Sequence, residues 1–289
     1  MVIPVKKAIG IILGVTMLVC GTAALCFVCF KYIKSWRIHD PKYDILAIVQ
    51  VTPDNEPLKT VYLSELLNLS VDQPTNIYRF NLENAERQLL SSPLIKKAKI
   101  QKNYPGIIYI HYVSRVPIAF LADFTNTAID KEGVPLPFKP FFTPKILPEI
   151  YLGMDEKIDD NFLGKPIKNK RVTLALKLLK ELSTHLVTES SVLKRIDVSQ
   201  SFAQSYGQKQ IVVVMEDKIE KVKNGLSVVC HQSRILRLSS TGYSQELGNY
   251  LKLRKYLVEK ETMENQSKLR ESKVIDLRIP ELGFIKTEG

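Results

Sequence analysis

The chain has 289 residues, of which 45% are hydrophobic and 25% charged, a composition typical of proteins that fold around packed cores. Its formal net charge is +11, but no zinc-finger, RNP or helix-turn-helix pattern accompanies the basic residues. We therefore interpret the charge as solvated surface rather than as a nucleic-acid interface. Three of the four cysteines lie in an apolar N-terminal segment, which leaves Cys230 for the rest of the chain and excludes an intramolecular disulfide there.

An uncharged stretch runs from Ala8 to Phe30 and is long enough to cross the hydrocarbon core of a bilayer as a helix. A cleaved signal peptide is the alternative, but its apolar core is normally only about 7–15 residues long. We therefore predict an uncleaved transmembrane helix at 8–30, after a short tail at 1–7. Basic residues flank both ends, so the positive-inside rule does not choose an orientation. No second stretch of this kind follows, and the remainder is expected on one side of the membrane.

A small α+β module is predicted after a juxtamembrane linker at 31–44. A strand is expected at 45–51 and a helix at 61–69, followed by a second helix that Asn81 can cap. A hairpin comes next, with Tyr104-Pro105-Gly106 in the order that a type II turn favours. The predicted order is strand, helix, helix, strand, strand, in which two helices back a small sheet.

Strand patterns predominate from Pro117 onward, interrupted by two amphipathic helices at 170–186 and 247–259. The proline-rich stretch from Pro135 to Pro148 is interpreted as a stiff, partly packed crossover rather than as a polyproline ligand. Pro280 follows the last predicted strand, and this suits a strand end or a sheet edge better than a central strand. The predicted strands are 118–122, 128–130, 149–152, 193–198, 210–215, 227–231 and 273–279.

Patterns typical of catalytic and metal-binding sites are missing from the sequence. None of the four histidines stands in a nucleophile-elbow context, and outside the apolar segment no Cys or His pair has the spacing of metal ligands. Cys230 and His231 are neighbours on a predicted strand and therefore point to opposite faces. No Gly-rich phosphate loop occurs. We predict a protein that is not an enzyme, with no catalytic residue, metal, cofactor or small-molecule substrate.

Five short motifs occur in an order that resembles one protein family. They are residues 92–100 (SPLIKKAKI), 102–106 (KNYPG), 113–119 (VSRVPIA), 128–133 (AIDKEG) and 274–279 (VIDLRI). The first two resemble part of the POTRA domain of the FtsQ/DivIB cell-division proteins. The next two resemble the junction and turn that follow it, and the last resembles the end of that family's β domain. Their order and spacing, along nearly the whole chain, carry the resemblance.

The resemblance implies an α+β fold: a single transmembrane helix, a POTRA domain (β-α-α-β-β) at 45–115 and a mostly antiparallel β domain with two helices at 116–289. It implies a bitopic divisome scaffold in the cytoplasmic (inner) membrane at the division septum, with a cytoplasmic N-terminus and an extracytoplasmic C-terminal domain. The implied partners are FtsB-like and FtsL-like single-pass division proteins, and other divisome components at the POTRA domain. The implied role is to help couple septal peptidoglycan synthesis to cell division.

In this family the last β-domain strand and its flank receive the FtsB-like partner by strand addition. Here Ile279 stands where the family usually has an aromatic residue. We expect Arg278 to make a charge-assisted contact to an acidic residue of the partner. The matching residues, which we expect to bind the partner, are Val274, Ile275, Asp276, Leu277, Arg278, Ile279, Gly283 and Phe284.

Two other classes of function remain as alternatives. A POTRA-containing translocation component would usually carry several POTRA copies or a long run of barrel strands, and neither an internal repeat nor such a run is found. A membrane-tethered envelope enzyme would need a nucleophile and a base that converge in a pocket, and the sequence offers no such pair.

Overall fold

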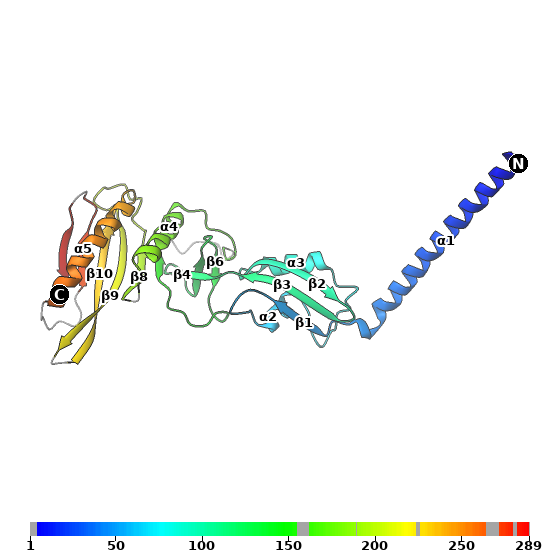
Figure 1. Ribbon diagram of the computed structural model, residues 1–289, viewed down its shortest axis with the longest axis horizontal. Coiled ribbons are helices and arrows are strands. Elements are labelled where there is room, and N and C mark those ends of the chain that lie inside the picture. Colours follow the sequence, from blue (N-terminus) through cyan, green and yellow to red (C-terminus); the bar gives the residue numbers. More distant parts are fainter. Residues whose placement is uncertain are drawn as a thin grey trace. The chain divides into compact units, whose positions relative to one another are not determined.

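The computed structural model in Figure 1 describes residues 5–154, 162–188, 190–223, 226–263, 272–279 and 282–288. The chain divides into two compact units, Met1–Ser114 and Arg115–Gly289, which are described separately. The first unit contains α1 (Val5–His39), a 3-10 turn (Pro41–Tyr43), β1 (Ala47–Val51), α2 (Thr60–Leu66), α3 (Leu82–Ser91), β2 (Ile95–Asn103) and β3 (Ile107–Ser114). The second contains β4 (Pro117–Leu121), β5 (Thr127–Asp130), β6 (Pro135–Pro137), β7 (Glu149–Tyr151), α4 (Lys170–His185), β8 (Ser191–Asp197), β9 (Ile211–Lys223), β10 (Leu226–Leu238), α5 (Tyr243–Met263), β11 (Ser272–Asp276) and β12 (Phe284–Glu288).

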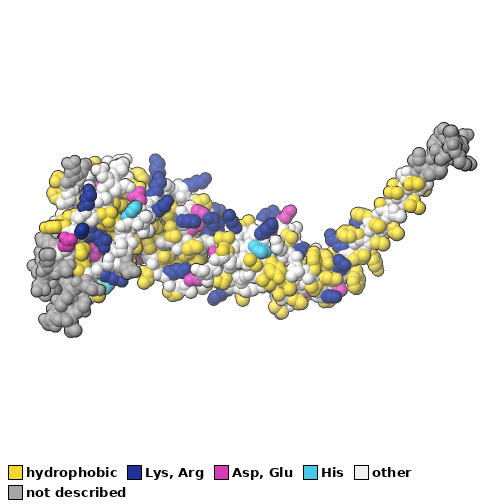
Figure 2. Space-filling model, in the orientation of Figure 1, with side chains coloured by type: hydrophobic (Ala, Val, Ile, Leu, Met, Phe, Trp, Pro, Cys, Tyr) yellow, Lys and Arg dark blue, Asp and Glu magenta, His cyan; other side chains and the backbone are white. Residues whose placement is uncertain are grey.

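The N-terminal helix α1 has the length and composition of a membrane span. Within the described residues, one helix passes that test, over Leu13–His39. Its apolar side chains are exposed along the helix, as Figure 2 shows, and Met17 is 81% exposed. These findings confirm the predicted single apolar helix. The helix continues beyond Phe30 to His39, because no Gly or Pro interrupts the residues after the uncharged stretch.

The sheet of the first unit confirms the predicted β-α-α-β-β order. Its strand order is β1-β3-β2, with β1 parallel and β2 antiparallel to β3. Ile108 and Ile110 of β3 are both fully buried, whereas Tyr109 between them is partly exposed, as the two-residue period of a strand requires. The buried side chains Leu63 of α2 and Leu89 of α3 belong to the same core, so both helices contribute to it.

Polar side chains hold the ends of elements in this unit. Asn81 caps α3 as predicted, because its side chain accepts a hydrogen bond from the Asn84 N–H at 3.0 Å. After β1, Oδ2 of Asp54 accepts hydrogen bonds from the N–H and the hydroxyl of Ser114, each at 2.7 Å. Burial alone would raise the pKa of Asp54, but these bonds and one from Thr52 outweigh it and lower the pKa. The carboxylate of Asp54 therefore fastens the end of β3.

The turn between β2 and β3 is not the predicted type II turn. The Tyr104–Pro105 bond is cis, and Gly106 lacks the positive φ that a type II turn needs at its third position. Gly106 is required for another reason, since a Cβ there would lie 2.2 Å from the carbonyl oxygen of Asp44. Its own carbonyl accepts a hydrogen bond from the N–H of Leu46 at 2.8 Å. The glycine therefore allows close backbone contact with the segment that leads into β1.

The second unit is built on a nine-stranded sheet with the order β12-β11-β10-β9-β8-β7-β4-β5-β6. Five of the eight neighbouring strand pairs are antiparallel, and this confirms the predicted α+β fold with a mostly antiparallel second part. β9 and β10 form a long hairpin in its middle, and both run further than the strands predicted at 210–215 and 227–231.

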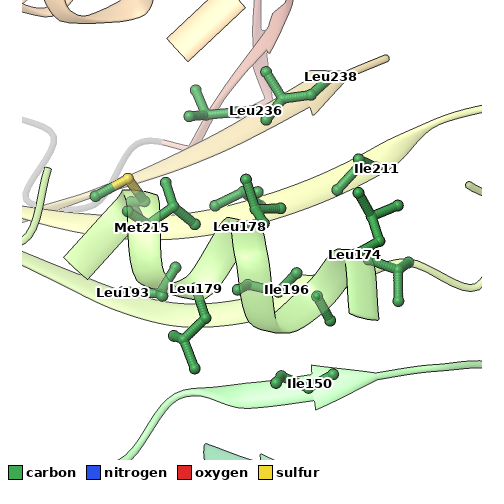
Figure 3. Packing of buried hydrophobic residues seen from close by; sticks show 14 of the residues in the cluster. Ile150, Leu174, Leu178, Leu179, Leu193, Ile196, Ile211, Met215, Leu236 and Leu238 are labelled. Atoms are coloured by element: carbon green, nitrogen blue, oxygen red, sulfur yellow. The ribbon is translucent and has the colours of Figure 1, made fainter. Parts of the chain in front are cut away.

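Both helices of this unit contribute to one apolar core. Leu174 and Leu178 of α4 belong to one buried cluster with strand residues that include Ile196, Ile211 and Met215 (Figure 3). Tyr250 of α5 is fully buried and belongs to the same cluster. The apolar positions that recur every three or four residues on the predicted helices therefore form the face that packs on the sheet.

A charged cluster lies beside this apolar layer and was not singled out from the sequence. The carboxylate of Asp217 on β9 accepts hydrogen bonds from Nε of Arg234 on β10 at 3.2 Å and from Nη2 of Arg254 on α5 at 2.9 Å. The side chains of Asp217 and Arg234 are 2% and 0% exposed. The ion pairs therefore tie α5 to the central hairpin.

Two of the five sequence motifs meet at the start of the second unit. Nη1 of Arg115 lies 2.7 Å from Oδ2 of Asp130, and Oδ1 of Asp130 accepts hydrogen bonds from the N–H groups of Glu132 and Val134. Gly133 has a φ of +79°, a conformation that favours glycine. Arg115, from the motif at 113–119, therefore stabilises the Asp-x-x-Gly turn of the motif at 128–133.

Candidate partner-binding site

The last described strand of the sheet is β12, which the sequence pattern did not predict. β12 pairs antiparallel with β11, and β11 pairs parallel with β10. Of the two alternatives for the strand at 273–279, the sheet edge is wrong, because β11 lies inside the sheet, and the strand ends at Asp276. Pro280, on which that prediction depended, lies outside the described residues. The residues after Gly283 begin with Phe284 and Ile285, which have high β propensity and continue the sheet.

β12 forms an open edge of the sheet. In the strand order, β11 lies on one side of β12, and no described strand lies on the other. Phe284 is 57% exposed and Ile285 is 44% exposed. The outer N–H and C=O groups of an edge strand can pair with a strand from another chain. This edge therefore offers both backbone groups and apolar side chains.

The opposite edge, β6, is built differently. It lies within the stretch that was interpreted as a crossover, and two of its three residues are Pro135 and Pro137. Proline has no N–H donor, which is why it is tolerated at an edge and why it weakens further strand pairing there. The carbonyl of Pro135 also accepts a hydrogen bond from the N–H of Gly164 at 2.9 Å. Strand addition is therefore disfavoured at β6 and open at β12.

The eight predicted binding residues occupy different environments. Val274, Ile275 and Leu277 are 8%, 0% and 6% exposed, so their side chains belong to the core rather than to an accessible surface. Ile279 and Phe284 are 46% and 57% exposed and are available for contact. Exposure therefore does not alternate along 274–279, since the neighbours Val274 and Ile275 are both buried.

Asp276, the last residue of β11, and Arg278 form an ion pair. Nη2 of Arg278 lies 2.7 Å from Oδ2 of Asp276, and Nε lies 3.0 Å from Oδ1, so the contact is bidentate. Nη1 of Arg278 donates to the carbonyl of Gly207 at 3.0 Å. Burial alone would raise the pKa of Asp276, but the hydrogen bonds and charge of Arg278 outweigh it and lower the pKa. Arg278 is thus fixed in direction while its side chain stays 20% exposed.

A groove of about 600 Å³ borders this ion pair. Glu246, near the start of α5, is fixed in its wall because Oε2 accepts a hydrogen bond from the Ser239 N–H at 2.7 Å. No sequence pattern indicated the groove, because its lining residues come from loops and from α5, far apart in the chain. The lining residues include Tyr206, Lys209, Glu246, Leu277, Arg278 and Gly283.

The described residues contain no group of three or more His, Cys, Asp and Glu side chains arranged to hold a metal ion. Cys230 is buried, whereas the neighbouring His231 is exposed and pairs with Glu216 on the adjacent strand. The two residues therefore point to opposite faces, as predicted, and do not form a thiol–imidazole pair.

The chain is similar to known cell-division proteins in two respects. The family described as POTRA domain, FtsQ-type matches residues 46–113, which contain the three-stranded sheet of the first unit. The chain is also 25% identical over 227 residues to the cell division protein DivIB of Clostridium tetani (strain Massachusetts / E88), covering 76% of this chain and 78% of that protein. These two matches support a relationship to the FtsQ/DivIB cell-division proteins. Because the POTRA match spans 68 residues (113 − 46 + 1), the likeness to DivIB extends well beyond the POTRA domain.

The chain thus carries one apolar helix that fits a single-pass membrane protein, followed by a domain of the FtsQ-type POTRA family and a second unit with its open edge at β12.

Proposed function

We propose that this protein is a non-enzymatic, single-pass scaffold of the division machinery, which binds FtsB-like and FtsL-like single-pass proteins. Its family and its apolar helix support this role. In the proposed arrangement the N-terminus is cytoplasmic, and both domains lie outside the cytoplasmic membrane at the septum. By holding its partners together there, the scaffold helps couple septal peptidoglycan synthesis to cell division.

The observation that carries the proposal is the contrast between the two edges of the nine-stranded sheet. β6 is closed by Pro135 and Pro137, whereas β12 presents exposed apolar side chains and an unpaired outer edge among the described strands. We assign strand addition by the FtsB-like partner to β12. Main-chain hydrogen bonds would provide affinity, and alternate side chains would provide specificity.

The pairing register suggests what the added strand carries. Ile285 lies opposite Ile275, and residues that are directly opposite each other share one face of a sheet. Since Ile275 is buried in the core, Ile285 extends the same apolar row to the open edge. A partner strand with apolar side chains at alternate positions would cover Ile285 and continue this row.

We assign to Arg278 a polar contact with the partner, next to the added strand. Its guanidinium is held by Asp276, and both Arg278 and Lys209 line the neighbouring groove. An acidic side chain of the partner would meet two positive charges there, with the geometry of Arg278 already set. The POTRA domain is assigned a second docking surface for other divisome components, and its short edge strand β1 is one candidate.

A capture experiment tests this proposal. The part after the anchor, residues 40–289, is immobilised and exposed to solubilised membranes of the source cell, beside a version that ends at Gly283 and lacks β12. We expect the longer version to retain small single-pass division proteins and the shorter, folded version to lose them. Equal capture by both would place the binding site elsewhere, and no captured division protein would contradict the scaffold role.

A further inference from the structure

The end of the anchor helix is packed against the POTRA domain through Arg37. Its guanidinium carbon lies 6.0 Å and 5.9 Å from the ring centroids of Tyr43 and Tyr78, and Nη1 donates to the Tyr78 hydroxyl at 3.2 Å. The side chain of Asn76 donates to the carbonyl of Arg37 at 3.0 Å. The helix end is therefore held by several directional contacts, beyond its covalent connection.

An aromatic row carries this contact to the β2–β3 turn. The rings of Tyr43 and Tyr78 are 5.2 Å apart in an edge-to-face arrangement, and those of Tyr78 and Tyr104 are 5.1 Å apart. Tyr104 opens the turn and is still 52% exposed. The row therefore fixes the turn beside the last part of α1.

The length of the helix indicates how deep in the bilayer the junction between α1 and the POTRA domain lies. The uncharged stretch ends at Phe30, and four further residues at about 1.5 Å each place Lys34 roughly 6 Å beyond it. The headgroup layer on each side of a bilayer is about 5–8 Å thick, so Lys34 lies at the level of lipid phosphates. Trp36 is 63% exposed and Tyr32 is 76% exposed, and both residue types favour this interface.

Lys102, at the end of β2, brings a second positive charge to the same place. Burial of its ammonium group lowers the pKa of Lys102, and the charge of Lys34 lowers it further. The aromatic row brings Lys102 toward the end of the anchor, because Lys102 stands two residues before Tyr104, whose ring lies 5.1 Å from that of Tyr78. An anion held by both lysines would offset the repulsion between their charges.

We propose that Lys34 and Lys102 bind the phosphate of an anionic phospholipid, so that the β2–β3 turn rests on the membrane surface. The length of the anchor places Lys34 at the depth where lipid phosphates lie, and the aromatic row brings the end of β2, which carries Lys102, to the same end of the helix. The site fixes how the POTRA domain stands on the bilayer. It is separate from the strand-addition site, which lies in the other unit of the chain.

The test uses the full-length protein in nanodiscs of phosphatidylcholine that contain a trace of dansyl-labelled phosphatidylglycerol or dansyl-labelled phosphatidylcholine. Trp36 is the one tryptophan of the chain and serves as the energy donor. We expect transfer to the anionic probe to exceed transfer to the zwitterionic probe, and to fall as salt is added. Replacing one lysine should reduce the preference by up to about fivefold.

Single variants Lys34→Gln and Lys102→Gln, and the double variant, are compared with the control Lys97→Gln/Lys99→Gln, which removes two exposed charges from the same strand β2. The proposal requires each single variant to lose part of the preference while the control keeps it. If Lys102→Gln keeps the full preference, the POTRA domain takes no part and the proposal is wrong. Equal transfer to both probes in the unaltered protein also overturns it.

Discussion

The carboxylate of Asp276 holds the guanidinium of Arg278, two residues further along, in a bidentate ion pair with contacts of 2.7 Å and 3.0 Å. The pair lies at the end of β11 and before β12 begins, beside the groove at the start of α5. Asp276 thereby sets the direction of Arg278 before any partner arrives. An arginine fixed in this way loses less rotamer entropy on binding than a free one.

Arg278→Glu should abolish capture of the FtsB-like partner. The change replaces a cation with an anion next to Asp276 and next to the proposed acidic residue of the partner, at an expected cost of about 2–5 kcal/mol in binding. Binding of the partner's soluble segment, measured by calorimetry, checks this result. Lys255→Glu, an exposed charge reversal on α5, is the matched control and should bind normally. Unchanged affinity of the Arg278 variant would remove this residue from the site.

Ile285→Lys should weaken strand addition at β12. A lysine on an exposed edge disfavours pairing with another chain, and it would also interrupt the apolar row that continues from Ile275. Ile146→Lys makes the same change at a position that is 91% exposed and away from this edge, and it should have no effect. Pull-down of the partner with each variant compares the two. Equal loss, or no loss in either variant, would contradict the assignment of β12.

Asp217→Ala should destabilise the β domain without touching the proposed binding edge. Arg234 would be left buried without its carboxylate partner on β9, and the loss of one member of a buried pair costs about 3–5 kcal/mol. Urea unfolding of the domain measures the change. Arg254→Met should cost less, because the Arg254 side chain is 16% exposed and reaches water. A larger effect at Arg254 than at Asp217 would mean that the pair with Arg234 is not the dominant one.

Asp54→Asn should destabilise the POTRA domain by about 1–2 kcal/mol at pH 7, because a neutral amide cannot replace the charge-assisted bonds to Ser114. The pKa of Asp54 is lowered in the folded state, so its contribution is present above the unfolded value and is lost as pH falls through the folded one. The difference between the variant and the unaltered protein should therefore shrink below about pH 4. Thermal unfolding over pH 3–7 measures it, with the exposed Asp72→Asn as control. A difference that stays unchanged between pH 7 and pH 3 would contradict this account.

The elements with clear periodicity could be predicted from the sequence. The leucines of α4 and the alternation of β3 each report which face is buried, and the cap of α3 was recognisable from Asn81. The misses have physical causes. β6 consists largely of prolines, which argue against a strand unless it is known to lie at an edge. β12 has just five residues, and its strand character depends on pairing with β11.

The candidate site could be predicted only in part. The position of the site near the end of the chain follows from the motif at 274–279, which gives residue identities but not pairing. Which strand forms the edge depends on how the chain returns after Gly283, and that is a tertiary property. In the sequence, the Asp276–Arg278 pair is indicated only by two opposite charges at alternate positions. The groove residue Lys209 comes from a loop before β9, so only the folded sheet places it beside Arg278.

The most direct test of the scaffold account is site-specific photocrosslinking in dividing cells, with benzoylphenylalanine in place of Phe284 on β12 and, as control, in place of Ile146. The account predicts a crosslink from position 284 to a small single-pass division protein, identified by mass spectrometry, and none from position 146. The crosslink should disappear when Arg278→Glu is added. A folded, membrane-inserted protein that crosslinks to no division protein from position 284, or equally from both positions, would contradict the proposal that β12 is the docking edge of this scaffold.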